Sequence, residues 1–380
     1  MPLPVAAGAL AISVLLATGS TGQWWLDDFG LPHEELTGAG VVVAVIDTGV
    51  DAKHADLSAA VLPGADFSGQ GKDDGSLPVG PRSFHGTMVA SLIAGQGKES
   101  GGVVGVAPGA SILPISIGLG IPGADTDAQL ADAVRWAVDN GADVINLSLT
   151  RNSAKWPQSW DEAFSYAFSN DVVIVAASGN EEQGAFATAP AVIPGVISVT
   201  TVNQELLTTG QAGSEGIGVS IAAPGEALLG SVPGGEAQLW SGSSAATPIV
   251  SGLIALMLEA DPEANANDVI ERLLRSATDL GEPGFDAAFG FGLINPAGAI
   301  AARDVSSENP LGSLDRWIAL YRPEVAEDQA PLVLPNVEVS QAQSHEVAQV
   351  QAEPPINPLI YVGLVSFLLL ALVLRLIRRR

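Results

Sequence analysis

Short, mainly apolar runs recur through the middle of the chain and are separated by stretches with helical periodicity. The apolar runs are residues 41–46, 112–117, 144–147 and 172–176. Continuous rather than alternating apolar residues are typical of strands that are buried on both faces, as in a parallel sheet. Helices are expected between and after them, over 127–139 with Thr126 as N-cap, 251–259 and 267–276. The pattern predicts an α/β fold with three layers, in which helices flank both faces of a central, mainly parallel sheet.

The C-terminal end has the pattern of a membrane anchor. Residues 359–374 carry no charge, and arginines follow at 375 and 378–380. A helix of about 19 residues spans most of a hydrocarbon core of about 30 Å. We therefore expect a transmembrane helix over 358–377 and a cytoplasmic tip over 378–380, because basic residues favour the cytoplasmic side. The alternative is a buried C-terminal core helix.

The N-terminal end indicates export. Residues 2–17 carry no charge, and small residues follow them. This pattern predicts a secretory signal peptide over 1–22, and the alternative is an uncleaved N-terminal anchor. In both cases the body of the protein lies outside the cell membrane and the C-terminus lies in the cytoplasm.

Composition excludes several classes of protein. The chain has 42 acidic and 16 basic residues, a net charge of −26, which argues against nucleic acid as a partner. It has no cysteine, so disulfides, thiolate metal sites and a cysteine nucleophile are excluded. Residues 323–358 are rich in Pro, Glu, Gln and Val without periodicity. We expect a stalk over 304–357, interrupted by a short amphipathic helix over 314–321.

Four polar residues stand where a parallel sheet places its chemistry. Asp47 ends the first apolar run, and Asn180 follows the last one closely. His85 begins a helical stretch, and Ser244 lies at the start of another, where free backbone N–H groups suit an oxyanion. Each residue alone has an ordinary explanation as a turn, a cap or a hydrogen-bonded side chain. Together, the order Asp, His, Ser is one of three found in serine hydrolase triads.

The segments around these residues resemble the subtilisin-like serine proteases, or subtilases. The resemblance covers residues 38–302 and rests on five segments: 43–50 (the Asp motif), 54–57, 85–90 (the His motif), 144–149 (the substrate-lining strand) and 242–248 (the Ser motif). It implies the three-layer subtilisin-like fold. It also implies that Ser244 is the nucleophile and His85 the general base. Asp47 would orient the imidazole, and Asn180 would donate its side-chain amide to the oxyanion.

The resemblance also implies a site for an extended peptide or protein substrate. Ser148 and Leu149, with Gly118 and Gly120, would offer backbone groups to the peptide by strand addition. Thr188 falls where a glycine often floors the S1 pocket, which predicts a preference for small P1 residues. The other histidines (His33, His54 and His345) have no catalytic position in the family pattern.

No cofactor or metal is expected at the catalytic residues, and calcium elsewhere is left open. Asp56 matches a calcium ligand of some subtilases. The loop that would complete the site is altered at residues 96–99. The alternative is that Asp56 is a carboxylate in a surface loop.

The order of segments resembles the mycosins, the membrane-anchored subtilases of type VII secretion systems. A short arm (23–37) precedes the catalytic domain (38–303), the stalk and the membrane helix, and Trp24 and Trp25 are expected to pack this arm onto the body. The predicted function is a membrane-anchored, extracytoplasmic serine endopeptidase that cleaves secreted or surface proteins, with a type VII secretion complex as partner. The alternative is a scaffold of such a complex with the same fold and little turnover, favoured by crowding at Thr150 and Thr188. A lipase-like hydrolase fits poorly, because the Gly-x-Ser-x-Gly elbow is missing.

Overall fold

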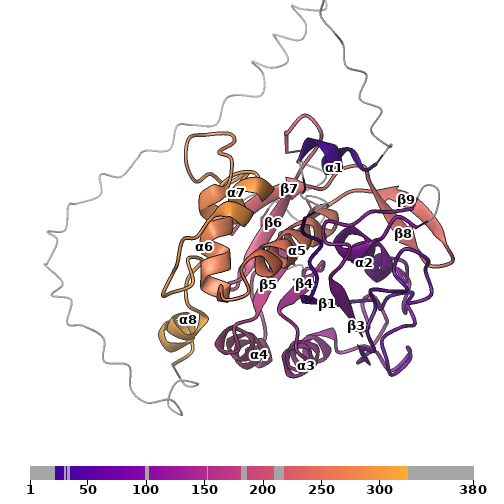
Figure 1. The fold of residues 1–380 in the computed structure, drawn as a ribbon. Coiled ribbons are helices and arrows are strands. Elements are labelled where there is room, and N and C mark those ends of the chain that lie inside the picture. Colours follow the sequence, from indigo (N-terminus) through magenta and orange to yellow (C-terminus); the bar gives the residue numbers. More distant parts are fainter. Residues whose placement is uncertain are drawn as a thin grey trace, which may run out of the picture. The chain divides into compact units, whose positions relative to one another are not determined.

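A parallel sheet forms the centre of the protein (Figure 1). The computed structural model describes residues 22–29, 31, 35–98, 102–151, 153–180, 186–208 and 218–323. In spatial order the strands are β2 (Ala65–Asp66), β3 (Ser111–Ser116), β1 (Val42–Asp47), β4 (Val144–Leu147), β5 (Val173–Ala177), β6 (Ile197–Val202) and β7 (Ile221–Pro224). All neighbouring pairs run parallel. A separate antiparallel hairpin consists of β8 (Leu228–Val232) and β9 (Glu236–Trp240).

Helices cover both faces of the sheet. They are α1 (Trp24–Asp28), α2 (His85–Ala94), α3 (Thr126–Asp139), α4 (Gln158–Ser169), α5 (Ser243–Ala260), α6 (Ala266–Ser276), α7 (Pro296–Ala301) and α8 (Leu314–Tyr321). Side chains of α2, α5 and α6 belong to one hydrophobic core, and those of α3 and α4 belong to the other. Figure 1 shows α3 and α4 together on one side of the sheet. The predicted three-layer α/β fold is confirmed.

Strand β1 is apolar from Val42 to Ile46 because helices cover both faces of the sheet. Val43 and Val45 lie in the core beneath α2 and α5, whereas Ala44 and Ile46 lie in the core beneath α3 and α4. Successive side chains of a strand point to opposite faces, so a strand covered on both faces needs apolar residues at every position. The four predicted strands are therefore present, with ends that shift by at most one residue.

The caps of two helices depend on side chains just before them. Asp125, not Thr126, is the N-cap of α3, so that prediction was wrong by one residue: its carboxylate accepts a hydrogen bond from the Ala128 N–H over 3.1 Å. A carboxylate also suits the positive end of the helix dipole. Helix α6 begins with a capping box between Asn265 and Asp268, each side chain bonding the other's backbone.

Helix α5 starts earlier than the sequence predicted and runs for 18 residues. By length and hydropathy alone it qualifies as a membrane span, but most of it is buried against the sheet. Pro248 lies inside the helix and has no N–H to donate to the carbonyl of Ser244, four residues earlier. The hydroxyl of Ser148 donates to that carbonyl instead, over 2.9 Å. The proline therefore ties the start of α5 to the end of β4.

The N-terminal arm packs onto the body, as predicted. Trp25 is 1% exposed and belongs to the core beneath α2 and α5. The indole N–H of Trp24 donates to the carbonyl of Glu226. The carbonyl of Gly22 accepts a hydrogen bond from the N–H of Leu229 in β8. The arm is thus held to the β8–β9 hairpin by backbone contacts and by one buried indole.

The predicted stalk begins too early in the sequence. Residues 304–323 lie on the body, and Leu314 of α8 is only 2% exposed. The helix expected at 314–321 has those bounds. The predicted signal peptide, the rest of the stalk, the transmembrane helix and the cytoplasmic tip lie outside the described residues and stay predictions.

Candidate active site

The carboxyl ends of three adjacent strands gather the polar residues of the site. Strands β1, β4 and β5 are neighbours in the sheet. Asp47 ends β1, Ser148 follows β4, and Asn180 follows β5 by three residues. Because parallel strands end at one edge, these residues share that edge although they are far apart in sequence.

Asp47 and His85 form the most strongly connected pair at this edge. The imidazole Nδ1 lies 2.9 Å from both Oδ1 and Oδ2 of Asp47. Asp47 is fully buried, and its Oδ1 also accepts the N–H of Thr48 over 2.7 Å. An ionised carboxylate can only accept, so Nδ1 carries the shared hydrogen and Nε2 of the neutral ring is free to accept a proton.

The start of helix α2 holds the imidazole against this carboxylate. The N–H of Gly86 donates to the hydroxyl of Thr48 over 3.0 Å. A side chain at Gly86 would meet the carbonyl of Gly49, so only glycine allows the helix to approach the Asp-Thr-Gly turn this closely. The indole ring of Trp240 meets the His85 ring edge-on, at 5.4 Å between centroids. The imidazole is thus restrained by a turn, a carboxylate and an aromatic ring.

Ser244 is the second residue of α5 and makes a reciprocal pair with Ser148. Its hydroxyl donates to the Ser148 carbonyl over 3.1 Å, while the Ser148 hydroxyl donates to the Ser244 carbonyl. The side-chain amide of Asn146 donates in turn to the Ser148 hydroxyl over 3.0 Å. The single hydroxyl hydrogen of Ser244 is therefore committed to Ser148 in this structure and not to His85.

Asn180 presents its amide nitrogen at the N-terminus of α5. Its Oδ1 accepts both the N–H and the hydroxyl of Ser243, over 3.0 and 3.1 Å. Gly242 has φ of 132°, and a side chain there would crowd the Asn180 amide. Because Oδ1 is engaged with donors, the NH₂ end remains to donate to another group. The backbone N–H of Ser244 lies in the first turn of α5, where such groups have no partner within the helix.

Gly118, which is predicted to offer backbone groups to a peptide, already uses its N–H inside the protein. Its N–H donates to the side-chain oxygen of Gln129 over 2.7 Å, and its carbonyl accepts from the N–H of Ile121. The N–H is therefore not available to a peptide, whereas the carbonyl oxygen keeps a second lone pair, so a role of Gly118 in peptide binding stays a prediction. Gly120 lies in the following turn with φ of 70°, which favours glycine. Its role in peptide binding stays a prediction.

Leu149 and Thr188 lie beside the polar edge. Leu149 is half-buried directly after Ser148. Thr188 is also half-buried, and its N–H donates to the carbonyl of Ser178, just before the Gly179–Asn180 pair. This places Thr188 next to the segment that carries the candidate oxyanion donor.

Asp56 does not fit a calcium site in the described residues. It is 1% exposed, and its Oδ1 accepts the N–H of Lys98. Its Oδ2 accepts both the N–H of Val103 and the hydroxyl of Ser231. Oxygens engaged with N–H and O–H donors are poorly placed to ligate a hard cation. No group of acidic or histidine side chains able to hold a metal occurs in the part of the chain that the structure describes.

Asp56 instead joins three separate segments, and its loss should lower stability. Asp56→Ala leaves two backbone N–H groups and one hydroxyl without an acceptor. The donors of Val103 and Ser231 are buried, and each such group costs about 1–3 kcal/mol. We expect the free energy of unfolding in urea to fall by about 3 kcal/mol or more. Lys53→Ala, an exposed residue in the same loop, is the control and should change it little. A fall below about 1 kcal/mol for Asp56→Ala would contradict this account.

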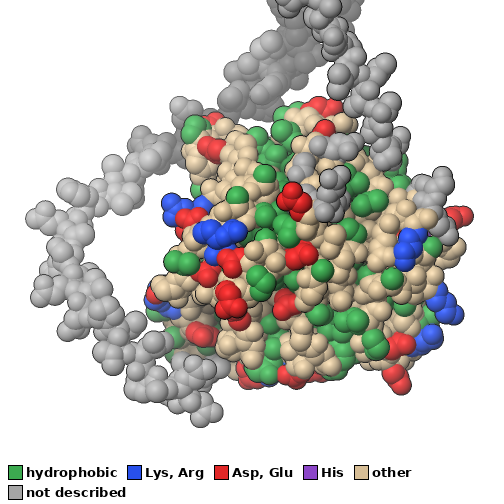
Figure 2. All heavy atoms as spheres, viewed as in Figure 1, with side chains coloured by type: hydrophobic (Ala, Val, Ile, Leu, Met, Phe, Trp, Pro, Cys, Tyr) green, Lys and Arg blue, Asp and Glu red, His purple; other side chains and the backbone are tan. Residues whose placement is uncertain are grey.

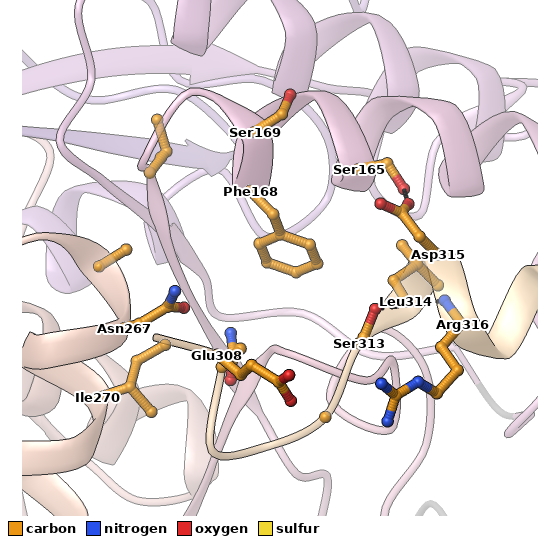
Figure 3. Close-up of a pocket in the computed structure, with 14 residues that line it drawn as sticks. Ser165, Phe168, Ser169, Asn267, Ile270, Glu308, Ser313, Leu314, Asp315 and Arg316 are labelled. Atoms are coloured by element: carbon orange, nitrogen blue, oxygen red, sulfur yellow. Dashed lines mark hydrogen bonds between the residues drawn. The ribbon is translucent and has the colours of Figure 1, made fainter. Parts of the chain in front are cut away.

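A cavity of about 400 Å³ lies away from this edge (Figure 3). Figure 3 shows Phe168 of α4 at its centre, with Asn267 of α6 on one side and Arg316 of α8 on the other. Phe168 precedes β5, whereas Asn180 follows it, so the cavity lies toward the amino end of that strand. It is not part of the candidate active site.

The geometry of the residues at this sheet edge defines a class of protein. A buried carboxylate holding a histidine, with a serine and an amide at a helix N-terminus, is the arrangement of a serine hydrolase of Asp-His-Ser order. A model of the subtilase family matches residues 38–292. The chain belongs to the subtilase family.

Individual relatives agree with this assignment. Subtilisin E of Bacillus subtilis is 36% identical over 270 residues, which are 70% of this chain and 67% of that protein. Fervidolysin of Fervidobacterium pennivorans is 36% identical over 311 residues, 74% of this chain. This chain spans only 42% of the length of fervidolysin. These homologues support a serine endopeptidase.

Solved structures agree as well. The crystal structure of fervidolysin, a keratinolytic enzyme, matches with a TM-score of 0.66 at 32% identity, covering 75% of this chain and 46% of that one. MycP1 with its N-terminal propeptide removed matches with a TM-score of 0.62 at 28% identity, covering 77% of this chain and 99% of that one.

Two residues of the site were not predicted from the sequence. Asn146 is the one polar residue within β4, and a polar residue in an otherwise apolar strand was a signal that could have been used. Trp240 lies in an exposed hairpin strand, and nothing local indicates that its ring reaches His85.

Proposed function

We propose that this protein is a membrane-anchored, extracytoplasmic serine endopeptidase that cleaves secreted or surface proteins through an acyl-enzyme. The observation that carries the proposal is the buried Asp47 carboxylate that holds Nδ1 of His85 at 2.9 Å from both its oxygens. This bond leaves Nε2 as the base at the same sheet edge as Ser244 and Asn180.

The residues perform acyl transfer in two halves. As Ser244 Oγ attacks the peptide carbonyl carbon, His85 Nε2 takes the hydroxyl proton, and Asp47 stabilises the resulting imidazolium. The carbonyl oxygen becomes an oxyanion, which accepts hydrogen bonds from the Asn180 amide and the Ser244 N–H. His85 then gives the proton to the leaving amine, which departs and leaves an acyl group on Ser244. In the second half, water attacks the acyl carbonyl carbon while His85 Nε2 takes a proton from it. The bond to Ser244 Oγ then breaks, Ser244 recovers its proton from His85, and the carboxylic acid is released.

A fluorophosphonate probe tests the activated nucleophile. The full chain is labelled in isolated membranes, with Ser244→Ala as the control. We expect covalent labelling of the parent protein and none of the alanine variant, because the probe needs an activated hydroxyl. A folded parent protein that takes no label would contradict the proposed activity.

The membrane anchor and a link to type VII secretion are the finer part of the proposal. The charge pattern at residues 359–380 and the likeness to MycP1 over 99% of that chain support them. The orientation of the chain in the membrane is tested with two tagged forms, one with the tag at the C-terminus and one with the tag after residue 322. The measurement is whether a protease outside the cell reaches each tag. Protease treatment of intact cells should remove only the second tag.

One observation favours the alternative of a scaffold with little turnover. The Ser244 hydroxyl is bonded to the Ser148 carbonyl rather than to His85. Activity requires the hydroxyl to rotate toward the imidazole. If labelling of the parent protein appears only when partner proteins are added, the scaffold or a partner-activated enzyme becomes the better account.

The S1 pocket is proposed to prefer small residues. Thr188 places a branched side chain where many relatives have glycine, and it lies beside the segment that leads to Asn180. In a peptide library we expect P1 Ala to exceed P1 Phe by about tenfold in kcat/KM, and Thr188→Gly to reduce that ratio. A profile of the parent protein dominated by Phe or Leu would contradict this prediction.

The surface charge bears on substrate choice only weakly. Figure 2 shows acidic side chains spread across one face of the body rather than gathered at one point. With a net charge of −26 the chain should attract basic peptides at low salt. Such attraction between exposed charges is screened beyond about 8 Å at physiological ionic strength.

A further inference from the structure

The first half of helix α8 packs against α4 and the loop before it. Leu314 is buried in the core beneath α3 and α4. Figure 3 shows Asp315 accepting a hydrogen bond from Ser165 of α4, at 2.6 Å. Trp317 packs against Trp156, with 4.5 Å between ring centroids. Helix α8, which follows the predicted catalytic domain, is therefore packed onto the folded body.

Arg322, directly after α8, makes the most specific contacts of this segment. Its Nη1 donates to Oδ2 of Asp161 and its Nη2 donates to the carbonyl of Trp156, both over 2.7 Å. The guanidinium also lies over the rings of Trp156 and Trp317, at 5.7 and 5.4 Å from their centroids. A planar guanidinium can donate to two acceptors and stack on aromatic rings at the same time, whereas the ammonium of a lysine cannot.

The partner carboxylate is buried, so this contact is not an ordinary surface ion pair. The Asp161 side chain is 1% exposed, and its Oδ1 accepts the indole N–H of Trp156 over 2.7 Å. Burial raises the pKa of Asp161, and the bonds from Trp156 and Arg322 offset this only in part. Removing Arg322 would leave a buried carboxylate with one donor.

Trp156 belongs to the loop that joins the polar edge to α4. We define this β4–α4 loop by its described residues, 150–151 and 153–157; it begins directly after Ser148 and Leu149. Near its start, the N–H of Arg151 donates to the carbonyl of Ala189 over 2.8 Å. The N–H of Ala189 donates back to the carbonyl of Ser153. The loop is thus bonded at one end to the residue after Thr188 and at the other end to Arg322.

We propose that Arg322 is a positioning residue for peptide binding. It holds the β4–α4 loop, which follows Leu149 in the chain and is bonded to Ala189, the residue after Thr188. Peptide affinity therefore depends on a residue at the start of the segment that leads toward the membrane anchor. This inference rests on the proposed protease function for its effect on substrates, but the contact with the loop stands without it.

Three variants of the full chain test this role. Arg322→Ala removes all the contacts, and Arg322→Lys keeps a positive charge near Asp161 without the paired donors. Arg316→Ala is the matched control, since it removes the same kind of side chain from an exposed position on the neighbouring helix α8. We measure KM and kcat with a peptide substrate, the rate of fluorophosphonate labelling, the melting temperature, and hydrogen exchange at Arg151 and Ala189.

We expect Arg322→Ala to raise KM about tenfold, because a displaced loop misplaces the peptide, while labelling by the small probe changes less than about twofold. The amides of Arg151 and Ala189 should exchange faster. Arg322→Lys should recover much of the melting temperature but little of the KM. Arg316→Ala should leave KM and exchange unchanged.

Several results would overturn the proposal. These are an unchanged KM with unchanged exchange in Arg322→Ala, an equal effect of Arg316→Ala, or a KM that follows the melting temperature across all variants. A parent protein that takes no label refutes the protease function instead. In that case the exchange at Arg151 and Ala189 still decides whether Arg322 holds the loop.

Discussion

His85→Ala and Ser244→Ala are each expected to lower kcat by about 10⁶, the size of loss that removing either residue causes in subtilisin. The reason is that proton transfer and attack are one event, so either change removes the acyl-enzyme route as a whole. The double variant should be no slower than the single ones. Initial rates with a peptide ester, measured at high enzyme concentration, give the residual kcat.

The two single variants differ in what they do to the fold, and this provides the control. His85→Ala leaves the fully buried Asp47 without its imidazole, so its melting temperature should fall. Ser244→Ala removes one hydrogen bond, from the Ser244 hydroxyl to the Ser148 carbonyl, and its melting temperature should lie near that of the parent protein. If Ser244→Ala retained kcat within about tenfold of the parent value, Ser244 would not be the nucleophile.

Asn180→Ala is expected to lower kcat by about 10²–10³ with little change in KM, since an oxyanion donor acts mainly in the transition state. The substitution also removes the acceptor for the N–H and hydroxyl of Ser243. A loss of activity could therefore come from disorder at the start of α5. A second variant separates the two causes.

Asn180→Asp is that variant, because it keeps an acceptor for Ser243 and removes the amide donor. We expect it to be at least as slow as Asn180→Ala, since a negative charge would face the developing oxyanion. Steady-state kinetics of both variants with one substrate make the comparison. Parent-like turnover in Asn180→Asp would show that Asn180 acts by holding the helix and not by donating to the oxyanion.

The reciprocal bonds of Ser148 and Ser244 connect fold and chemistry. Pro248 leaves the Ser244 carbonyl without its helical partner, and Ser148 supplies one. The same residue accepts the Ser244 hydroxyl through its carbonyl. The position of the candidate nucleophile thus depends on a proline four residues later and on the end of a neighbouring strand.

Much of the fold could be read from local pattern. The run at residues 41–46 is apolar throughout, and the one at 144–147 is apolar except for Asn146, because both faces of the sheet are covered. That pattern does not depend on which helix covers which face. Asp47, His85 and Asn180 could be singled out because each stands at the end of a strand or the start of a helix. The chain order Asp, His, Ser and the surrounding motifs then indicated the family.

The sequence by itself thus determined the three-layer α/β class, the family and the candidate catalytic residues, since these depend on short-range periodicity and on motifs. Only the tertiary structure decided that Gly118 gives its N–H to Gln129, that both oxygens of Asp56 accept hydrogen bonds, and that Arg322 reaches the β4–α4 loop. The physical reason is the same in each case. A hydrogen bond joins groups that are close in space, and the order of residues along the chain does not specify which distant donor will satisfy a given acceptor.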